Sequence, residues 1–212
     1  MRRLLIATTN PAKLAEYRLL LRDLELELVS LGEVGIADAP EESGATFAEN
    51  ALIKARFYFA RARVATLADD GGLEIDALGG EPGVRSHRWL NSGGDDSDAA
   101  LVAEVIRRMK DVPSGRRGAR LRAATALIYD DDDGRVRERI AEAAIEGVIA
   151  ERAYPQIRAG FPYRAVLFMP ERGCYVGELG DEEEAKISQR RIALNTLRDD
   201  LARIAAGRSS RL

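Results

Sequence analysis

Two adjacent carboxylates, Asp69 and Asp70, stand directly before Gly71 and Gly72, at the end of an apolar run. Adjacent like charges repel, so a folded protein usually keeps such a pair for solvation, for a turn or for a cation. Glycines let the backbone approach a ligand closely or adopt a positive φ. The segment therefore suits a divalent metal ion that carries phosphates.

A second polar segment, Thr8-Thr9-Asn10-Pro11-Ala12-Lys13, follows the apolar stretch Leu4–Ala7. Asn10 is a candidate N-cap, and Pro11 suits the first position of a helix. The N–H groups at a helix N-terminus attract anions, and Lys13 adds a charge that can reach a phosphate. The alternative is an ordinary helix cap beside a solvated lysine.

A third polar segment is the loop Glu41-Glu42-Ser43-Gly44, which precedes a helix that begins with Thr46 and Glu49 in a capping-box spacing. A carboxylate of this loop could supply a second ligand to a cation held by Asp70, whereas the alternative is an acidic surface loop. Together the three segments supply what hydrolysis of a nucleoside triphosphate needs. Those needs are a phosphate cradle, carboxylates for Mg²⁺ and a carboxylate that can orient or deprotonate water.

Composition limits the partners and the chemistry. The net charge of −3 over 212 residues offers no basic field to a nucleic acid. The only histidine, His87, excludes a His-rich zinc site, so we expect oxygen ligands and Mg²⁺. Cys174 has no second cysteine to pair with, and no apolar run approaches the roughly 20 residues of a membrane span. These features predict a cytoplasmic protein without a membrane partner.

The polar segments must be positioned by a mixed α/β sheet, because strands and helices alternate first and long hairpins follow. On the second helix, Asn50 and Lys54 share one face.

The run Asp130–Gly134 lacks the spaced ligands of a calcium loop, so a solvated hairpin turn is favoured. Periodicity predicts helices over 11–22, 46–63, 96–110 and 185–206, and strands over 4–7, 26–31, 65–69, 73–76, 121–129, 136–149, 163–168 and 174–179.

Four longer segments carry a family resemblance. The first three are IATTNPAK (Ile6–Lys13), EESGATFAENALIKA (Glu41–Ala55) and LADDGGLEIDALGGEPGVRS (Leu67–Ser86). The fourth is the stretch Ile187–Leu194, which begins with ISQR and ends with AL. In order and spacing they resemble the inosine triphosphate pyrophosphatase family, which cleaves deaminated purine triphosphates such as ITP, dITP and XTP. The resemblance implies one domain over residues 1–212, an elongated curved mixed sheet flanked by helices, and two lobes with a central cleft. It also implies a homodimer, and Mg²⁺-dependent attack of water that releases a nucleoside monophosphate and pyrophosphate.

The resemblance assigns roles to individual residues. Asp70 matches the general base and a metal contact, and Glu41 matches the other acidic metal contact. The residues expected to bind the substrate are Thr8, Thr9, Asn10, Lys13, Lys54, Gly71, Phe161, Tyr163, Arg164, Lys186, Gln189 and Arg190.

The chain departs from the family pattern at several of these positions. Thr9 replaces a glycine, Gly71 a serine, Arg164 an aspartate, Glu184 a lysine and Gln189 a histidine. Most of the later positions contact the purine base or its neighbouring phosphates in the family. An acceptor-only aspartate and a donor-only arginine recognise different base edges. We therefore expect intact metal and water chemistry with an altered or relaxed base preference.

Two other classes of function stay open. A nucleotide-binding protein that has lost hydrolysis would keep the ligand, but the retention of Asp70, Glu41 and Lys13 argues against it. A purely structural dimerisation protein would bind no Mg²⁺–nucleotide at all.

Overall fold

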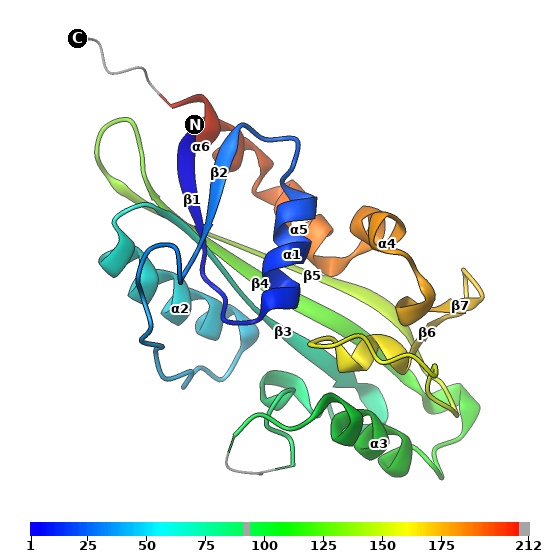
Figure 1. The fold of residues 1–212 in the computed structure, drawn as a ribbon. Helices are drawn as coiled ribbons and strands as arrows, with labels where there is room; N and C mark the ends of the chain where they lie inside the picture. Colours follow the sequence, from blue (N-terminus) through cyan, green and yellow to red (C-terminus); the bar gives the residue numbers. More distant parts are fainter. Residues whose placement is uncertain (91–93, 208–212) are drawn as a thin grey trace. The chain divides into compact units, whose positions relative to one another are not determined.

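The computed structural model describes residues 1–90 and 94–207, and its strands form one seven-stranded sheet in the order β2-β1-β3-β4-β5-β6-β7 (Figure 1). Strand β1 pairs in parallel with β2 and β3, whereas β6 pairs antiparallel with β5 and β7. The sheet is therefore mixed, as predicted. The strands are β1 (Arg2–Ile6), β2 (Leu26–Ser30), β3 (Ala65–Ile75), β4 (Gly118–Asp130), β5 (Val136–Ile149), β6 (Leu167–Met169) and β7 (Cys174–Tyr175).

The first two helices begin where local sequence signals place them. Asn10 Oδ1 accepts hydrogen bonds from the N–H groups of Ala12 and Lys13, and Thr46 and Glu49 form a complete capping box. These caps satisfy backbone donors that the first helical turn leaves unpaired. The helices are α1 (Pro11–Leu20), α2 (Phe47–Ala62), α3 (Asp98–Arg108), α4 (Asp181–Ile187), α5 (Gln189–Thr196) and α6 (Arg198–Ala206).

The chain divides into two compact units, and their boundaries fall within β3, β4, β5 and the first residues of α5. Unit 1 holds residues 1–70, 124–143 and the chain from 190 onward, and unit 2 holds residues 71–123 and 144–189. The single domain expected from the family resemblance stays a prediction.

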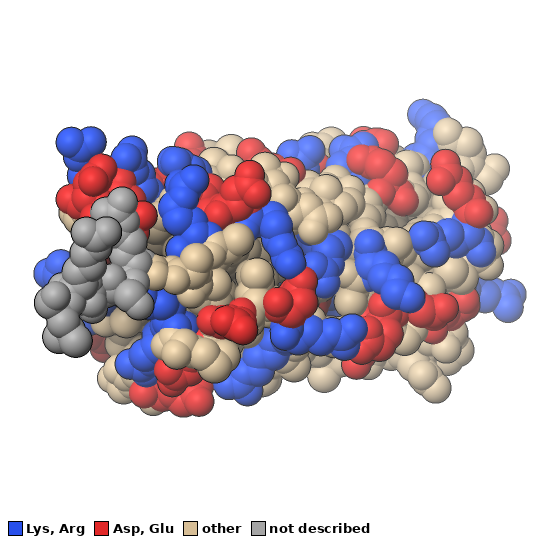
Figure 2. Space-filling model, turned by 90° about the horizontal axis from the view of Figure 1, so that it is seen from above, with Lys and Arg blue, Asp and Glu red and all other residues tan. Residues whose placement is uncertain are grey.

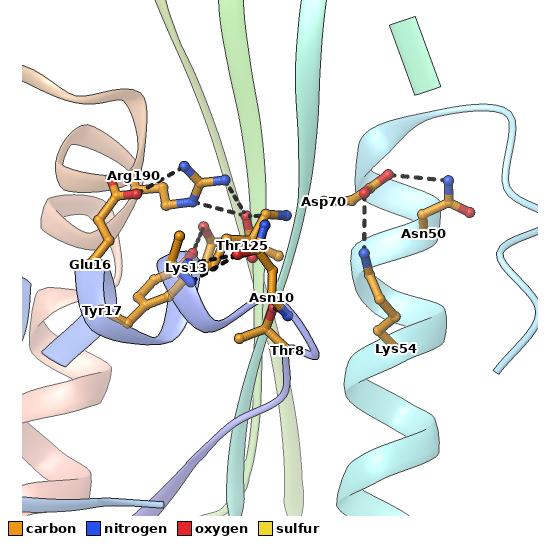
Figure 3. A network of polar contacts seen from close by, with 12 residues as sticks. Thr8, Asn10, Lys13, Glu16, Tyr17, Asn50, Lys54, Asp70, Thr125 and Arg190 are labelled. Atoms are coloured by element: carbon orange, nitrogen blue, oxygen red, sulfur yellow. Dashed lines mark hydrogen bonds and ion pairs between the residues drawn. The ribbon is translucent and has the colours of Figure 1, made fainter. Parts of the chain in front are cut away.

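Unit 1 is organised around its strands of the sheet. The side chains of Leu4 and Leu5 in β1 are fully buried, and so are those of Tyr17 and Leu20 in α1. Figures 1 and 3 show α2 on one side of these strands, with α1 and α5 on the other. Residues that alternate along a strand of this unit therefore face different helices.

Unit 2 has its own hydrophobic core. Leu73 and Ile75 of β3 pack in one buried cluster with Leu101 and Val105 of α3. Tyr163 belongs to the same cluster and lies in a short 3₁₀ turn, Pro162–Ala165. This core holds the second group of candidate residues.

Four sequence expectations about elements were wrong. The predicted break between 65–69 and 73–76 is absent because β3 runs through both glycines, and a Cβ on Gly71 would lie 2.3 Å from the carbonyl oxygen of Arg122. The expected helix 185–206 is three helices, since Ser188 is extended and Leu197 leaves helical geometry. The expected strand 163–168 is mostly the 3₁₀ turn, and only Leu167–Met169 forms β6. The expected strand 174–179 is also short, because β7 ends at Tyr175 and a 3₁₀ turn, Val176–Glu178, follows.

Two surface properties bear on partners. Over the described ranges 1–90 and 94–207, no helix is both long enough and apolar enough to span a bilayer. Figure 2 shows basic and acidic side chains interspersed over the face that it displays.

Candidate functional site

The turn between β1 and α1 is ordered by its own side chains. Thr8 Oγ1 accepts a hydrogen bond from the N–H of Asn10 at 3.1 Å, and Asn10 caps the helix as described above. Thr9, by contrast, is exposed at the tip of the turn. The turn therefore presents Lys13 on the first turn of α1 without depending on a ligand for its shape.

Asp69 is buried in unit 1 and contacts two cations, Lys13 and Arg190. Figure 3 shows these two cations, with Glu16 beside Arg190. Asp69 Oδ2 lies 3.3 Å from Lys13 Nζ and 2.9 Å from Arg190 Nη2, and Arg190 Nη1 donates to Glu16 Oε2 at 3.2 Å. Burial raises the pKa of the Asp69 carboxyl, but Lys13 and Arg190 outweigh burial and hold that pKa well below its ordinary value. Asp69 therefore stays ionised and fixes two cations beside the β1–α1 turn.

At Lys13, burial is the dominant influence on the pKa. Removal from water lowers the pKa of the Lys13 ammonium below its ordinary value, even though the charge of Asp69 raises it. The Lys13 side chain is 9% exposed. A cation that is this poorly hydrated favours an anionic ligand, because a phosphate group would replace the lost solvation.

Asp70 follows Asp69 on β3, so its side chain points to the opposite face of the sheet, toward α2 (Figure 3). Its Oδ2 accepts from Asn50 Nδ2 at 3.2 Å and its Oδ1 from Lys54 Nζ at 3.1 Å. Lys54 Nζ also lies 3.4 Å from Glu42 Oε2. Burial lowers the pKa of Lys54, but Asp70 and Glu42 together raise it above its ordinary value. The lysine therefore stays charged between two carboxylates.

The loop before α2 is tied to the same cluster. Asn50 Oδ1 accepts from the N–H of Gly44 at 2.8 Å, while the amide nitrogen of the same side chain contacts Asp70. The acid of this loop that pairs with Lys54 is Glu42, and its neighbour Glu41 is exposed. One buried amide thus links the loop backbone to the carboxylate expected to act as the base.

A second group of candidate residues lies in unit 2. The Arg164 guanidinium stacks on Phe161, with 3.5 Å from Cζ to the ring centroid, and Arg164 Nε lies 2.6 Å from Glu184 Oε1. The Tyr163 hydroxyl donates to the carbonyl oxygen of Ser86, and burial raises the pKa of Tyr163 above its ordinary value. The Phe161 ring is thus held by the Arg164 guanidinium, and the Tyr163 ring by its hydrogen bond to Ser86.

The remaining predicted residues of this group differ in accessibility. Lys186 is exposed on α4. Gln189 begins α5 and is only 5% exposed, and its Oε1 has no hydrogen-bond partner within 1–90 and 94–207. Gln189 therefore offers a buried acceptor that a donor on a ligand could satisfy.

Comparison with known proteins identifies the family. The model of the Ham1 family matches residues 4–200. The dITP/XTP pyrophosphatase of Xanthomonas campestris pv. campestris (strain 8004) is 40% identical over 201 residues, which are 95% of this chain and 98% of the relative. The chain belongs to the Ham1 family. A further relative of the same name and a solved structure also match the chain.

Both matches support the assignment. The dITP/XTP pyrophosphatase of Geobacillus kaustophilus (strain HTA426) is 39% identical and is covered over 98% of both chains. The structure of a HAM1 protein from Coxiella burnetii superposes with a TM-score of 0.80 at 33% identity, covering 95% of this chain and 98% of that one. The family resemblance and the mixed α/β fold predicted from the sequence are confirmed, and the roles of single residues stay predictions.

Several contact residues escaped the sequence reasoning in this Ham1 family chain. Asn50 was recognised only as a neighbour of Lys54 on the helix, although a buried amide on a helix face signals a required hydrogen bond. No local signal predicts that Glu42 pairs with Lys54, or that Arg158 donates to Glu184.

The donor set can be tested against the divalent metal that the sequence predicts. Within the described parts of the chain, no three His, Cys, Asp or Glu side chains cluster as a metal site. The Asp70 side chain is 13% exposed, and its two oxygens contact the uncharged amide of Asn50 and the cation of Lys54. Mg²⁺ commonly takes one or two protein carboxylates and completes its shell with water and substrate phosphates. The residues present fit that mode and do not form an all-protein cage.

Proposed function

We propose that this Ham1 family chain hydrolyses deaminated purine nucleoside triphosphates, such as ITP, dITP and XTP, to the nucleoside monophosphate and pyrophosphate. The observation that carries the proposal is the pair of oppositely directed carboxylates on β3. Asp69 is tied to Lys13 and Arg190, and Asp70 to Asn50 and Lys54. Relatives that are about 40% identical over nearly the whole chain are dITP/XTP pyrophosphatases, which supports the same substrate class.

Each residue has a chemical role in this proposal. The N–H groups that begin α1, with Lys13, bind the triphosphate, because a helix N-terminus and a poorly hydrated cation both favour an anion. Asp70 orients the attacking water and accepts its proton while the water oxygen bonds to phosphorus and the bond to the departing pyrophosphate breaks. Lys54 stabilises the negative charge that remains on the phosphates.

Mg²⁺ is part of the proposal. Asp70 and an acid of the 41–42 loop, Glu41 as the sequence predicts or Glu42, would hold it. When bound, Mg²⁺ would neutralise charge on the phosphate oxygens. We also propose the homodimer and the cytoplasmic location that the resemblance implies, together with an altered or relaxed base preference that involves Gln189.

Steady-state release of pyrophosphate tests the proposal. Wild-type protein with Mg²⁺ should hydrolyse ITP, dITP and XTP faster than ATP or CTP, and Asp70→Asn should lower kcat about 10³-fold while ITP still raises the melting temperature. If wild-type protein binds ITP but releases pyrophosphate at the rate of Asp70→Asn, the chain is a nucleotide-binding protein without hydrolysis. If no nucleotide shifts the melting temperature, a structural role replaces both.

A further inference from the structure

Two opposite charges meet in the interior of unit 2. Arg164 lies in the 3₁₀ turn and Glu184 in α4, and each side chain is 4% exposed. Arg164 Nε lies 2.6 Å from Glu184 Oε1. In the family pattern the position of Arg164 holds an aspartate and that of Glu184 holds a lysine, so both charges are reversed in this chain. The two residues are 20 positions apart in the sequence but contact each other in the fold.

Both oxygens of Glu184 have a cation beside them. Arg158 Nη1 donates to Glu184 Oε2 at 2.8 Å, Arg158 Nη2 donates to the carbonyl oxygen of Leu179 at 2.8 Å, and Arg158 also pairs with Asp181 at 3.0 Å. The cluster of Arg158, Arg164, Asp181 and Glu184 therefore contains two charges of each sign. The hydrogen bond to Glu184 comes from Arg158 at Oε2, whereas Arg164 faces Oε1 as an ion pair. A buried charge is tolerated when an opposite charge balances it in this way.

The cluster also fixes aromatic side chains. The Arg164 guanidinium lies against Phe161, and the next residue back from Arg164 is Tyr163, which bonds to Ser86. A guanidinium that is stacked on a ring and paired with a carboxylate has few remaining orientations. Movement of Glu184 would therefore be transmitted to the segment that carries both rings.

We propose that Arg164 and Glu184 are one exchanged pair of positioning residues, which holds the segment 158–165 against α4 and whose charges can be reversed only together. The consequence for catalysis rests on the function proposed above: the pair sets the position of Phe161 and Tyr163 for the nucleotide and does not itself read the base. The charge reversal at Arg164 is thus compensated within the protein, and it does not account for a change in base preference.

A charge-exchange cycle tests this pairing. The variants are Arg164→Glu, Glu184→Arg and the double exchange, with the milder Arg164→Gln and Glu184→Gln for the case that a reversed charge prevents folding. The matched control is the exposed pair Arg56–Glu138, whose side chains are 57% and 38% exposed and whose nitrogen and oxygen lie 2.6 Å apart.

Thermal unfolding gives the first readout. Each single reversal at 164 or 184 should lower the melting temperature by about 6–15 °C, because a buried charge loses its partner. The double exchange should recover at least half of that loss. The same exchange at Arg56 and Glu138 should move the melting temperature by at most about 3 °C. Among the mild variants, Glu184→Gln should cost more than Arg164→Gln, since Glu184 serves two arginines.

Kinetics with ITP and GTP give a readout that a merely structural role would not move. The mild single variants should raise KM for ITP about tenfold and change kcat by less than about threefold. The double exchange should have a KM closer to the wild-type value than either single reversal has. Additive losses of melting temperature would overturn the pairing. A change of more than about tenfold in the ITP-to-GTP ratio of kcat/KM in the double exchange would show that Arg164 reads the base directly. If no triphosphate is hydrolysed, the proposed function fails while the unfolding cycle still decides the pairing.

Discussion

Lys54 Nζ lies 3.1 Å from Asp70 Oδ1, on the opposite side of the sheet from the Asp69 network. The lysine comes from α2 and the carboxylate from β3, so the packing of this helix on this strand decides their separation. Because Lys54 also contacts Glu42, it holds two carboxylates that would otherwise repel each other. In the proposed function, the charge of Lys54 would also offset the negative charge that a triphosphate brings to these carboxylates.

Lys54→Gln should therefore lower kcat/KM for ITP about 10²-fold, since it removes a charge that balances Asp70 and stabilises the phosphates. Lys54→Arg should lose less, because it keeps the charge with a different geometry. The control is Arg56→Gln on the same helix, because Arg56 pairs with Glu138 on the surface. The kcat/KM of this variant should equal that of the wild-type protein. If Lys54→Gln has the same kcat/KM as the wild-type protein, Lys54 does not take part in the mechanism.

The two acids of the 41–42 loop can be separated by their metal dependence. If Glu41 is the metal contact that the sequence predicts, Glu41→Gln should raise the Mg²⁺ concentration for half-maximal activity about tenfold, and Glu42→Gln should leave it near the wild-type value. The opposite ranking would assign the contact to Glu42, the acid paired with Lys54 in the structure. The measurement is ITP hydrolysis over a Mg²⁺ titration at saturating substrate.

Local signals in the sequence predicted the parts of the site that are local in the fold. The Asn10 cap and the Thr46–Glu49 capping box are hydrogen bonds that span two or three residues, and both form as expected. The opposite directions of Asp69 and Asp70 follow from strand alternation, but only once β3 is known to continue through its glycines.

Contacts between distant segments could not be read from the sequence. Arg190 reaches Asp69 across 121 residues of chain, and Arg164 meets Glu184 only because the 3₁₀ turn packs near α4. The breaks at Ser188 and Leu197 also have no proline or glycine to mark them. Their extended or irregular backbone is set by the packing that buries both residues.

Asn50 should contribute to stability as well as to the site. Asn50→Ala leaves the N–H of Gly44 and one Asp70 oxygen without their partner, which should cost about 1–3 kcal/mol in the free energy of unfolding. Asn50→Asp keeps an acceptor for Gly44 but sets a second charge beside Asp70, so it should lose activity as well. Urea unfolding with an unchanged m-value measures the first effect. A wild-type midpoint in Asn50→Ala would show that water replaces both contacts.

Acid sensitivity should be partly located on α3. Hydrogen bonds from Arg107 and Arg108 lower the pKa of Glu104 from 4.5 to about 2, although partial burial opposes the shift. The folded-state pKa is below the unfolded one, so this stabilisation is full above about pH 4.5 and is lost as the pH falls toward 2.

Glu104→Gln should thus be less stable than the wild type by about 1 kcal/mol at pH 7, a value reduced for screening because Arg107 is largely exposed. The difference should vanish near pH 2. Unfolding curves of both proteins across this range provide the test, and a difference that persists at pH 2 would indicate lost packing in place of lost charge.

Replacing Gly71 by serine, the residue of the family pattern at this position, should not be tolerated well by the fold. A Cβ there would lie 2.3 Å from the carbonyl oxygen of Arg122 on the neighbouring strand, and a backbone oxygen cannot rotate away. Gly71→Ser should therefore destabilise the protein by about 1–3 kcal/mol and should not increase activity. Gly115→Ala is the control, since a Cβ at Gly115 meets nothing within 4 Å, and its unfolding free energy should change by at most about 0.5 kcal/mol. A stable and more active Gly71→Ser would mean that the two strands can separate at this point, and that the missing hydroxyl limits catalysis.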